Sequence, residues 1–465
     1  MMKNSLIYKL ILHALSVISA GAIAYICGFN VQQTLAICTF FASILGALLF
    51  WNFRLSFAFL GCSILLFTRV MTIDDFIKFS SMEIIFFLIG MMIIAGFLKE
   101  LGFFTWILSR ALIIRNLNAK KFMIMLIFTS ALLSCLIDEV SSIVFMLMLI
   151  FELSDFFEID PKPYVLTSVV ATNIGSAGTV IGNPIGILIA TKASLTFEDF
   201  LLHAFPLMVL TLLVLIGMLF IFFRKQMREL DEKIKLFGPN DYLVKLLNIP
   251  PEIKLRIGLI FFTFTILLIA FHYRIELLFG LRKDTILLIT PLLMASIVMI
   301  WRREHARKYV EKDVEWWTLL FFIFLFAQAG VLTQLGVAET LAKRILSIFS
   351  NNATSILTVT LMGSAIVSSV LDNVVVVTAF IPIIKSINTI MPFNGILWWA
   401  LLFGACYGGN ATIIGSTANI IAIGKLEKDK GITIGFLEWF KVGFIAASIT
   451  LAFVLFVLLL LPHYK

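Results

Sequence analysis

The stretch that decides the fold is Ala405-Cys-Tyr-Gly-Gly-Asn-Ala-Thr-Ile-Ile-Gly-Ser-Thr-Ala-Asn419. It lies inside an apolar segment, residues 396–424, which is long enough to cross a bilayer because about 20 apolar residues suffice. Its middle is rich in Gly, Asn, Thr and Ser, which form helices poorly and whose short polar side chains compete for backbone groups. Open backbone at membrane depth is tolerated only where protein or a wet cavity surrounds it. We therefore predict an interrupted helix beside a polar site.

A second copy of this pattern occurs earlier, as Asn173-Ile-Gly-Ser-Ala-Gly-Thr-Val-Ile-Gly-Asn-Pro-Ile-Gly186 within residues 163–190. Aligning Thr179 on Thr412 offsets the two stretches by 233 positions, and Asp138 and Asp372 are 234 positions apart. A near-constant offset through separate landmarks predicts two internal repeats. Interrupted helices at corresponding places in two halves indicate the binding site of a transporter.

The composition is that of a membrane protein. Of 465 residues, 61% are hydrophobic and 14% are charged, whereas a soluble domain is about 45–50% apolar and about 25% charged. The net charge of +8 comes from loop lysines and arginines and predicts no nucleic-acid partner, and the five cysteines show no metal-binding spacing. The chain has no nucleotide-binding loop or nucleophile motif, so we do not expect an enzyme.

We predict an all-α polytopic membrane protein with about 11 transmembrane helices, two re-entrant hairpins and inverted-topology repeats. The expected parts are scaffold spans (1–81), a first repeat (82–223) with hairpin 121–151 and interrupted helix 163–190, a cytoplasmic linker (224–256), further scaffold spans (257–314), and a second repeat (315–465) with hairpin 354–391 and interrupted helix 396–424.

The distribution of charge in the loops predicts the orientation, because Lys and Arg concentrate in cytoplasmic loops. Lys3 and Lys9 place the N-terminus in the cytoplasm, and the basic residues of linker 224–256 fit the same side. An odd number of crossings then separates the two repeats, which makes them inverted and leaves the C-terminus outside. We expect an integral protein of a bacterial inner (plasma) membrane.

The hairpins follow from two apolar pairs of arms, of which the first, 121–137 and 140–151, looks short for two full spans. Their tips carry Asp138-Glu139 and Asp372-Asn373. Ionisable groups in an apolar segment are costly and usually functional. The alternative is that each tip is an ordinary polar loop at the surface, which the apolar neighbours of Asp372 make less favourable.

Inverted symmetry brings both tips toward the interrupted helices, so we predict one central site. Carboxylate, amide, hydroxyl and carbonyl oxygens suit Na⁺ or H⁺ as coupling ion, with no other cofactor. The predicted ion- or substrate-binding residues are Asp138, Glu139, Asn173, Ser176, Thr179, Asn183, Asp372, Asn373, Asn410, Thr412, Ser416 and Asn419. A Na⁺ site is predicted at Asp138, Asn173, Asp372 and Asn410. The backbone is opened by Gly175, Gly178, Gly182, Gly408, Gly409 and Gly415.

The chain resembles the ion-transporter superfamily of arsenite efflux pumps, sodium/proton antiporters, the pink-eyed-dilution protein, and citrate and divalent-anion/sodium symporters. The resemblance rests on four stretches: Phe87-Leu-Ile-Gly-Met-Met-Ile-Ile94, Leu371-Asp-Asn-Val374 and the two interrupted-helix motifs, Asn173–Gly186 and Gly408–Asn419. It covers about residues 80–460. It implies a scaffold domain, often in a homodimer, and a transport domain that moves in an elevator-like way.

The sequence departs from two branches of that superfamily. Dicarboxylate symporters carry Ser-Asn-Thr at both hairpin tips, where this chain has Asp138-Glu139-Val140 and Asp372-Asn373-Val374. The antiporter branch usually has Asp at the place of Asn183 and Asn at the place of Gly186. The first departure argues against a dicarboxylate site of that kind. The second removes one carboxylate that a proton could use and leaves Asp138 and Asp372 as proton carriers.

The function that we predict is secondary active transport of a small ion, of Na⁺/H⁺ exchange type or Na⁺-coupled, by alternating access across the lipid bilayer. One alternative is an anion permease that exports arsenite or takes up a small carboxylate such as citrate. Another is a passive channel on the same scaffold. The sequence does not choose the substrate among these.

Overall fold

The computed structural model describes residues 2–50, 53–103, 106, 118–236, 253–349, 352–391, 393 and 395–460, and within these ranges it contains helices and no strands. Ten of these helices are long and apolar enough to cross a membrane. This makes the chain a polytopic membrane protein. We predicted about 11 transmembrane helices. The difference arises partly because two helices in the predicted scaffold spans are shorter apolar helices, α3 (Arg54–Phe67) and α17 (Thr285–Trp301).

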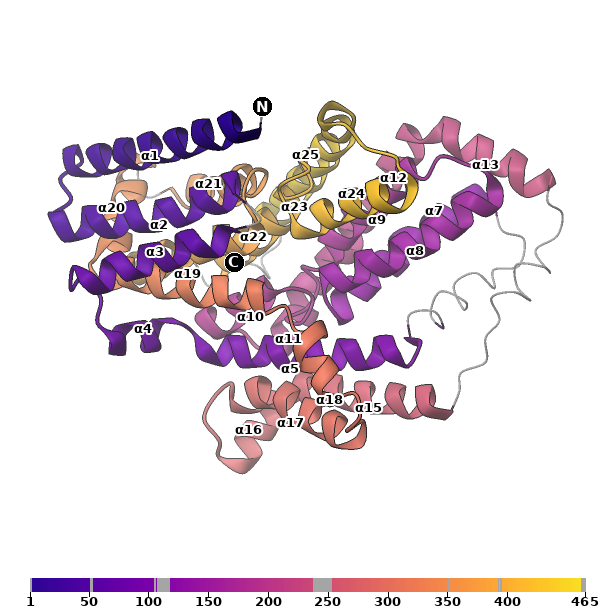
Figure 1. Ribbon diagram of the computed structural model, residues 1–465, viewed down its shortest axis with the longest axis horizontal. Helices are drawn as coiled ribbons and strands as arrows, with labels where there is room; N and C mark the ends of the chain where they lie inside the picture. The colour runs from indigo at the N-terminus through magenta and orange to yellow at the C-terminus, as the bar shows by residue number, and fades with distance from the viewer. Residues whose placement is uncertain are drawn as a thin grey trace.

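Two groups of helices lie outside the repeats. The N-terminal group, on the left of Figure 1, consists of α1 (Met2–Ile26), α2 (Val31–Leu49), α3 and α4 (Ile73–Phe79). The second group, below, consists of α15 (Ile253–Ala270), α16 (His272–Phe279), α17, α18 (Ala306–Lys308) and η3 (Tyr309–Asp313). Helix α1 exposes most of its apolar side chains, as expected of a helix that faces lipid.

The remaining helices form two series with the same order. The first series is α5 (Met82–Glu100), α7 (Ala119–Leu136), α8 (Glu139–Phe157), α9 (Lys162–Gly175), α10 (Pro184–Ala193), α11 (Phe197–Asp199), η2 (Phe200–Ala204) and α12 (Phe205–Phe222). The second is α19 (Trp316–Gln334), α20 (Val337–Ile348), α21 (Ala353–Ser368), α22 (Asn373–Ile390), α23 (Ile396–Gly408), α24 (Thr417–Lys430) and α25 (Phe436–Leu460). Helix α13 (Arg224–Leu236) follows α12, and residues 237–252 of the predicted linker lie outside the described ranges.

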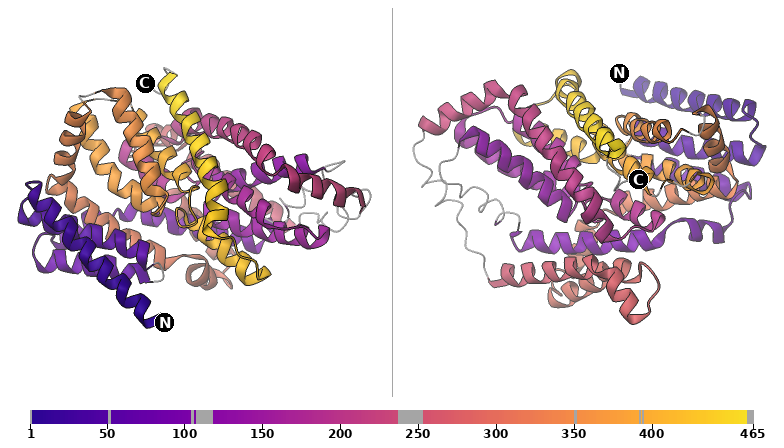
Figure 2. Two further views of the ribbon diagram at one scale, coloured as in Figure 1. Left: turned by 90° about the horizontal axis from the view of Figure 1, so that it is seen from above. Right: turned by 180° about the vertical axis from the view of Figure 1, so that it is seen from behind.

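The predicted hairpins correspond to two helix pairs, α7–α8 and α21–α22, which lie on opposite sides of the molecule. In Figure 1, α7 and α8 extend to the right and α21 and α22 to the left, while the tips between the paired helices face the centre. Seen from behind in Figure 2, α25 (yellow) lies between helices of the two series and contacts α12 and α23. The opposed pairs are the arrangement that an inverted repeat produces.

One premise of the hairpin prediction is wrong. Helix α8 continues beyond residue 151 to Phe157, so both arms of the first pair have the length of a membrane span. The sequence Glu152-Leu-Ser-Asp155 looks too polar for a span, but Leu153 and Ser154 are buried against the rest of the protein. The case for re-entrant hairpins therefore depends on where their tips lie.

Close packing explains two of the predicted glycines. A Cβ atom added to Gly175 would lie 2.3 Å from the carbonyl oxygen of Ala131, and one added to Gly408 would lie 2.4 Å from Ala365. These are matching positions in the two series, where the first half of each interrupted helix crosses the first arm of its own pair. Only glycine allows two helix backbones to approach this closely.

Candidate functional site

Both interrupted helices are broken as the sequence predicts, between α9 and α10 and between α23 and α24. The two breaks are joined by the side chain of Asn173, whose Nδ2 donates to Asn410 Oδ1 at 2.8 Å and to Asn419 Oδ1 at 2.9 Å. All three residues are completely buried. One amide therefore ties the first interrupted helix to both sides of the second break.

The second break is satisfied by its own polar residues. Asn419 Nδ2 donates to the carbonyl oxygens of Gly409 and Thr412, each at 2.8 Å, and Ser416 Oγ donates to Asn173 Oδ1 at 3.1 Å. These bonds replace the helical bonds that the break removes, as buried backbone groups require. We call Asn173, Asn410, Ser416 and Asn419 the amide joint.

The first break has a similar arrangement. Asn183 Nδ2 donates to Ser176 Oγ at 2.9 Å, Asn183 Oδ1 accepts from the backbone N–H of Gly186 at 2.8 Å, and Ser176 Oγ donates to the carbonyl oxygen of Asn173 at 2.9 Å. The Asn that stands where antiporters usually carry Asp thus uses its amide nitrogen as a donor. A carboxylate could not donate this bond.

Two threonines tie the helix pairs to the breaks. Thr179 Oγ1 donates to the carbonyl oxygen of Cys135, at the end of α7, and Thr412 Oγ1 donates to that of Ser369, at the end of α21. The two contacts occupy matching places in the two repeats. Each pair and the interrupted helix beside it are therefore held together near the tip.

Four helices begin at the centre, and each has a side-chain cap. Asp138 caps α8, Asn183 caps α10, Asp372 caps α22 and Ser416 caps α24, with acceptor-to-nitrogen distances between 2.7 and 3.2 Å. Asp, Asn and Ser are the residues preferred at this position. The positive ends of four helix dipoles consequently point toward one region.

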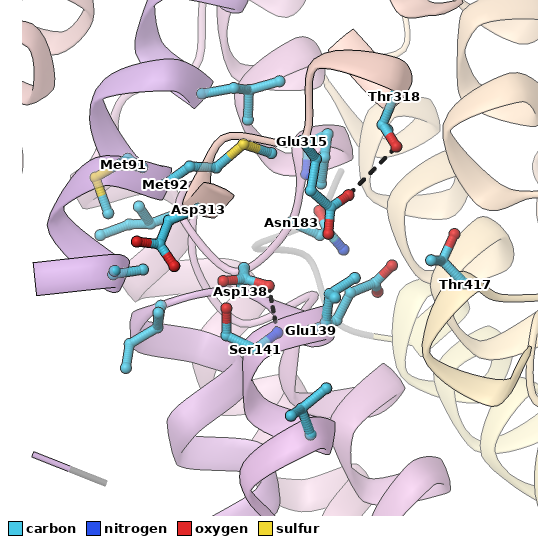
Figure 3. A pocket seen from close by; sticks show the side chains of 18 of the residues that line it. Met91, Met92, Asp138, Glu139, Ser141, Asn183, Asp313, Glu315, Thr318 and Thr417 are labelled. Atoms are coloured by element: carbon cyan, nitrogen blue, oxygen red, sulfur yellow. Dashed lines mark hydrogen bonds between the residues drawn. The ribbon is translucent and has the colours of Figure 1, made fainter. Parts of the chain in front are cut away.

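A cavity of about 260 Å³ opens beside this centre. Its polar wall carries Asp138 and Glu139 from one tip, together with Asn183 and Thr417 (Figure 3). Asp372 from the other tip lines the cavity as well. Thr417 Oγ1 donates to Asp372 Oδ2 at 2.6 Å. The opposite wall is apolar and comes largely from α5. Three carboxylates from the two tips therefore face one chamber.

Glu139 is the most deeply buried of these carboxylates, with 4% exposure. Among the described residues no group donates a hydrogen bond of ordinary geometry to its Oε2 atom, although the side chains of Asn373 and Ser176 lie near enough to favour the charged carboxylate. The charges of Asp138 and Asp372 act on the Glu139 carboxylate as well. A buried anion beside two others is unstable unless it binds a proton or a cation.

The structure separates the predicted site residues into two sets. Asp138, Glu139, Asn183 and Asp372 line the cavity, and Asn373 is buried next to it. Asn173, Ser176, Thr179, Asn410, Thr412, Ser416 and Asn419 instead bond to one another or to backbone around the breaks. The four residues predicted to hold Na⁺ are divided between these sets. No group of three or more His, Cys, Asp or Glu side chains within the described ranges is arranged to hold a metal ion.

Sequence reasoning missed several residues of the cavity region, among them Lys99, Lys312 and Asp313. Glu315 and Thr417 line the cavity, and Arg54 reaches the space next to it. Thr417 follows Ser416 at the start of a half-helix, so its position could have been predicted from the motif. Arg54 begins α3 and Glu315 directly precedes α19, and no spacing in the sequence connects them with the tips.

A second cavity, of about 370 Å³, lies at the matching place in the second repeat. Phe326, Ala329 and Gly330 of α19 line it where their counterparts Met92, Ala95 and Gly96 of α5 line the first cavity. Lysines line it as well, namely Lys78, Lys192 and Lys385. The repeat has thus produced two cavities with different charge.

Opposed helix pairs whose charged tips meet at two broken helices define a membrane transporter. The chain belongs to the family described as Citrate transporter, whose profile matches residues 43–404 and 329–464. It thereby falls within the ion-transporter superfamily that the sequence motifs resemble.

Relatives support the same class. The chain is 31% identical over 380 residues to an uncharacterised transporter of Mycobacterium tuberculosis, with 80% of this chain and 84% of that protein covered. It is 27% identical over 439 residues to the P protein of Homo sapiens, covering 80% of this chain and 52% of that protein. An uncharacterised transporter of Synechocystis is 23% identical over 407 residues, with 83% and 88% covered.

Proposed function

We propose that this transporter is a secondary active carrier in which Na⁺ or H⁺ binds at Asp138, Glu139 and Asp372. The observation that supports this most directly is the convergence of three carboxylates in one cavity where both tips meet both broken helices. Grouped carboxylates in a membrane-embedded cavity repel one another and are costly in low dielectric. Binding a cation or a proton relieves that cost, which couples the ion to the state of the carrier.

Alternating access would use the two cavities in turn. The cavity lined by α5 and the cavity lined by α19 occupy matching places in the repeats, which suits pathways to opposite sides of the membrane. In this proposal 121–151 and 354–391 are re-entrant hairpins, the N-terminus is cytoplasmic, and the carrier is a homodimer in a bacterial inner membrane. The linker 224–256 then joins the halves in the cytoplasm.

Two kinds of cargo fit this scheme. In Na⁺/H⁺ exchange the ion at the carboxylates is itself transported. In an anion permease the coupling cation accompanies a second substrate, such as arsenite or a small carboxylate. The family description favours a carboxylate such as citrate, and four helix N-termini at the centre would stabilise an anion there. Exchange remains our first candidate because the cavity wall is acidic.

Flux into proteoliposomes tests the proposal. Purified protein is reconstituted, and an imposed pH or Na⁺ gradient should drive uptake of labelled Na⁺, arsenite or citrate that saturates and shows counterflow. Asp372→Asn provides the control, because it removes one cavity charge at nearly constant volume. A flux that follows voltage and does not saturate would indicate a channel and contradict the proposal.

A further inference from the structure

Arg54 is unusual in its position. Among the residues that the structure describes it is the one Lys or Arg that is buried, with 6% exposure. It begins α3, where the helix dipole disfavours a cation. Burial of a charged group is costly unless opposite charges compensate it, so the surroundings of Arg54 must supply them.

The contacts of Arg54 connect it with Glu315, which lines the cavity of about 260 Å³ that we call the acidic cavity. Its Nη2 donates to Thr318 Oγ1 at 3.1 Å, and Thr318 Oγ1 in turn donates to Glu315 Oε2 at 3.2 Å. The guanidinium carbon lies 5.3 Å from the centre of the Phe321 ring, which is a favourable cation–π distance. These contacts with α19 fix the direction in which the guanidinium points.

Two carboxylates act electrostatically on Arg54, Asp372 and Glu315. Glu315 lies exposed at the mouth of the cavity, whereas Asp372 is half-buried at the second tip. Since water screens an exposed charge more strongly, Asp372 is the more important partner. Arg54 shares a space of about 430 Å³ with Glu315, Thr318 and Thr417, all of which also line the acidic cavity.

We propose that Arg54 is a tethered counter-cation of the acidic cavity. It compensates Asp372 and Glu315 while no coupling ion is bound, and it lowers the affinity of the cavity for that ion when the ion arrives. This inference depends on the proposed coupling at Asp138, Glu139 and Asp372. Arg54, which belongs to the N-terminal helices, would not position a substrate. It would set the affinity of the cavity for the coupling ion.

The charge of Arg54 would therefore balance the binding of the coupling ion against its release. Without Arg54, the carboxylates would repel one another with less compensation, so the ion-free protein would be less stable. The same loss would remove a positive charge that repels the entering cation. The coupling ion would then bind more tightly and stabilise the protein more. A residue that only packs would change stability by the same amount with and without the ion.

Thermal unfolding of the purified full-length protein separates these cases. The unfolding midpoint is measured against NaCl, with choline chloride keeping the ionic strength constant, and then from alkaline to mildly acidic pH. Wild type is compared with Arg54→Gln and Arg54→Lys. Arg54→Met is a second neutral variant that keeps an apolar contact with Phe321. Arg344→Gln is the matched control, because Arg344 also donates a hydrogen bond, to the carbonyl oxygen of Cys27, and lies over the ring of Phe29, but it lines neither the cavity nor the space beside it.

Neutral variants at Arg54 should unfold at a lower temperature than wild type without Na⁺ or at alkaline pH, and the difference should shrink as Na⁺ or protons are added. The half-saturating cation concentration should fall by about tenfold, as expected for one unit charge at short range in a partly screened site. Arg54→Lys and Arg344→Gln should keep the wild-type value.

A constant difference across all Na⁺ concentrations and pH values would overturn this role for Arg54 and leave the proposed coupling intact. A wild-type midpoint that responds to neither Na⁺ nor pH would instead overturn the coupling at the carboxylates, and the role of Arg54 with it.

Discussion

At the scale of single residues, the amide joint explains why the breaks contain Asn rather than Asp. Asn173 uses both ends of its amide at once: Nδ2 donates to Asn410 and Asn419, while Oδ1 accepts from Ser416. A group with its donor and acceptor capacity engaged in this way is better suited to hold two helices together than to bind an ion. The acidic residues beside the amide joint remain available to bind an ion or a proton.

Replacing Asn173 with Asp should destabilise the protein strongly. The carboxylate would face the side-chain oxygens of Asn410 and Asn419 without a proton to donate, and we expect a loss of about 3 kcal/mol from two broken buried bonds. Chemical unfolding of the purified variants measures it. Asn352→Asp is the control, because Asn352 only caps α21 and Asp caps a helix equally well. Equal stability of the two variants would contradict the structural role of the joint.

Replacing Asp372 with Asn should abolish ion-coupled transport while the protein still folds. Asn preserves the cap of α22 at nearly the same volume, so the charge is lost together with the second acceptor oxygen, which binds the Thr417 hydroxyl. Asp138→Asn should act similarly but less completely, because Glu139 is adjacent. Proteoliposome flux with an imposed Na⁺ or pH gradient provides the measurement. Normal coupled transport by Asp372→Asn would make Asp372 a structural cap.

At the scale of elements, the unit is a helix pair locked to an interrupted helix. Each unit has a glycine at the crossing and a threonine that bonds the end of the first arm, Gly175 with Thr179 and Gly408 with Thr412. The contacts hold the tip and the break in a fixed relation. Each unit is therefore expected to move as one body.

Gly175→Ala and Gly408→Ala should each destabilise the protein by roughly 1–3 kcal/mol or more, since the added methyl group overlaps the neighbouring backbone. The matched control is Gly363→Ala in α21, where a Cβ atom meets nothing within 4 Å. That change should be neutral or stabilise by up to about 1 kcal/mol, because Ala favours helix. Thermal unfolding distinguishes them, and a neutral Gly175→Ala would show that the crossing can separate without cost.

At the scale of the whole molecule, two opposed units meet at one acidic centre. The two helix pairs extend to opposite sides in Figure 1, and their tip residues Asp138 and Asp372 line the same cavity. Because both arms of the first pair are long enough to span a bilayer, it is this meeting of the tips, rather than arm length, that supports the hairpins. A pair whose tip lies at the centre returns to the side from which it entered.

Single cysteines should therefore label from one side within each pair. Cysteines near residues 120 and 152 should react with an impermeant thiol reagent from the cytoplasm, and cysteines near 353 and 391 from outside. A background without Cys27 and Cys38 removes the two partly exposed native thiols. Labelling of the two ends of either pair from opposite sides would mean that its helices cross the membrane completely.

The sequence by itself determined the membrane class, the two repeats and both helix breaks. These follow from local chemistry, because the runs Gly408–Ser416 and Gly175–Asn183 contain too many poor helix formers to stay helical inside apolar segments. The acidic tips were also predictable from local sequence, because a charged residue within an apolar segment is costly and usually functional.

Only the tertiary structure decided which of the polar residues face the cavity. Asn173 lies 237 and 246 positions from Asn410 and Asn419, and no sequence spacing indicates that these amides bond to one another. Glu315 lines the cavity and Arg54 lines the space beside it, although neither residue lies in the motifs. Long-range packing brings such groups together, whereas propensity and periodicity act only on residues that are neighbours in the chain.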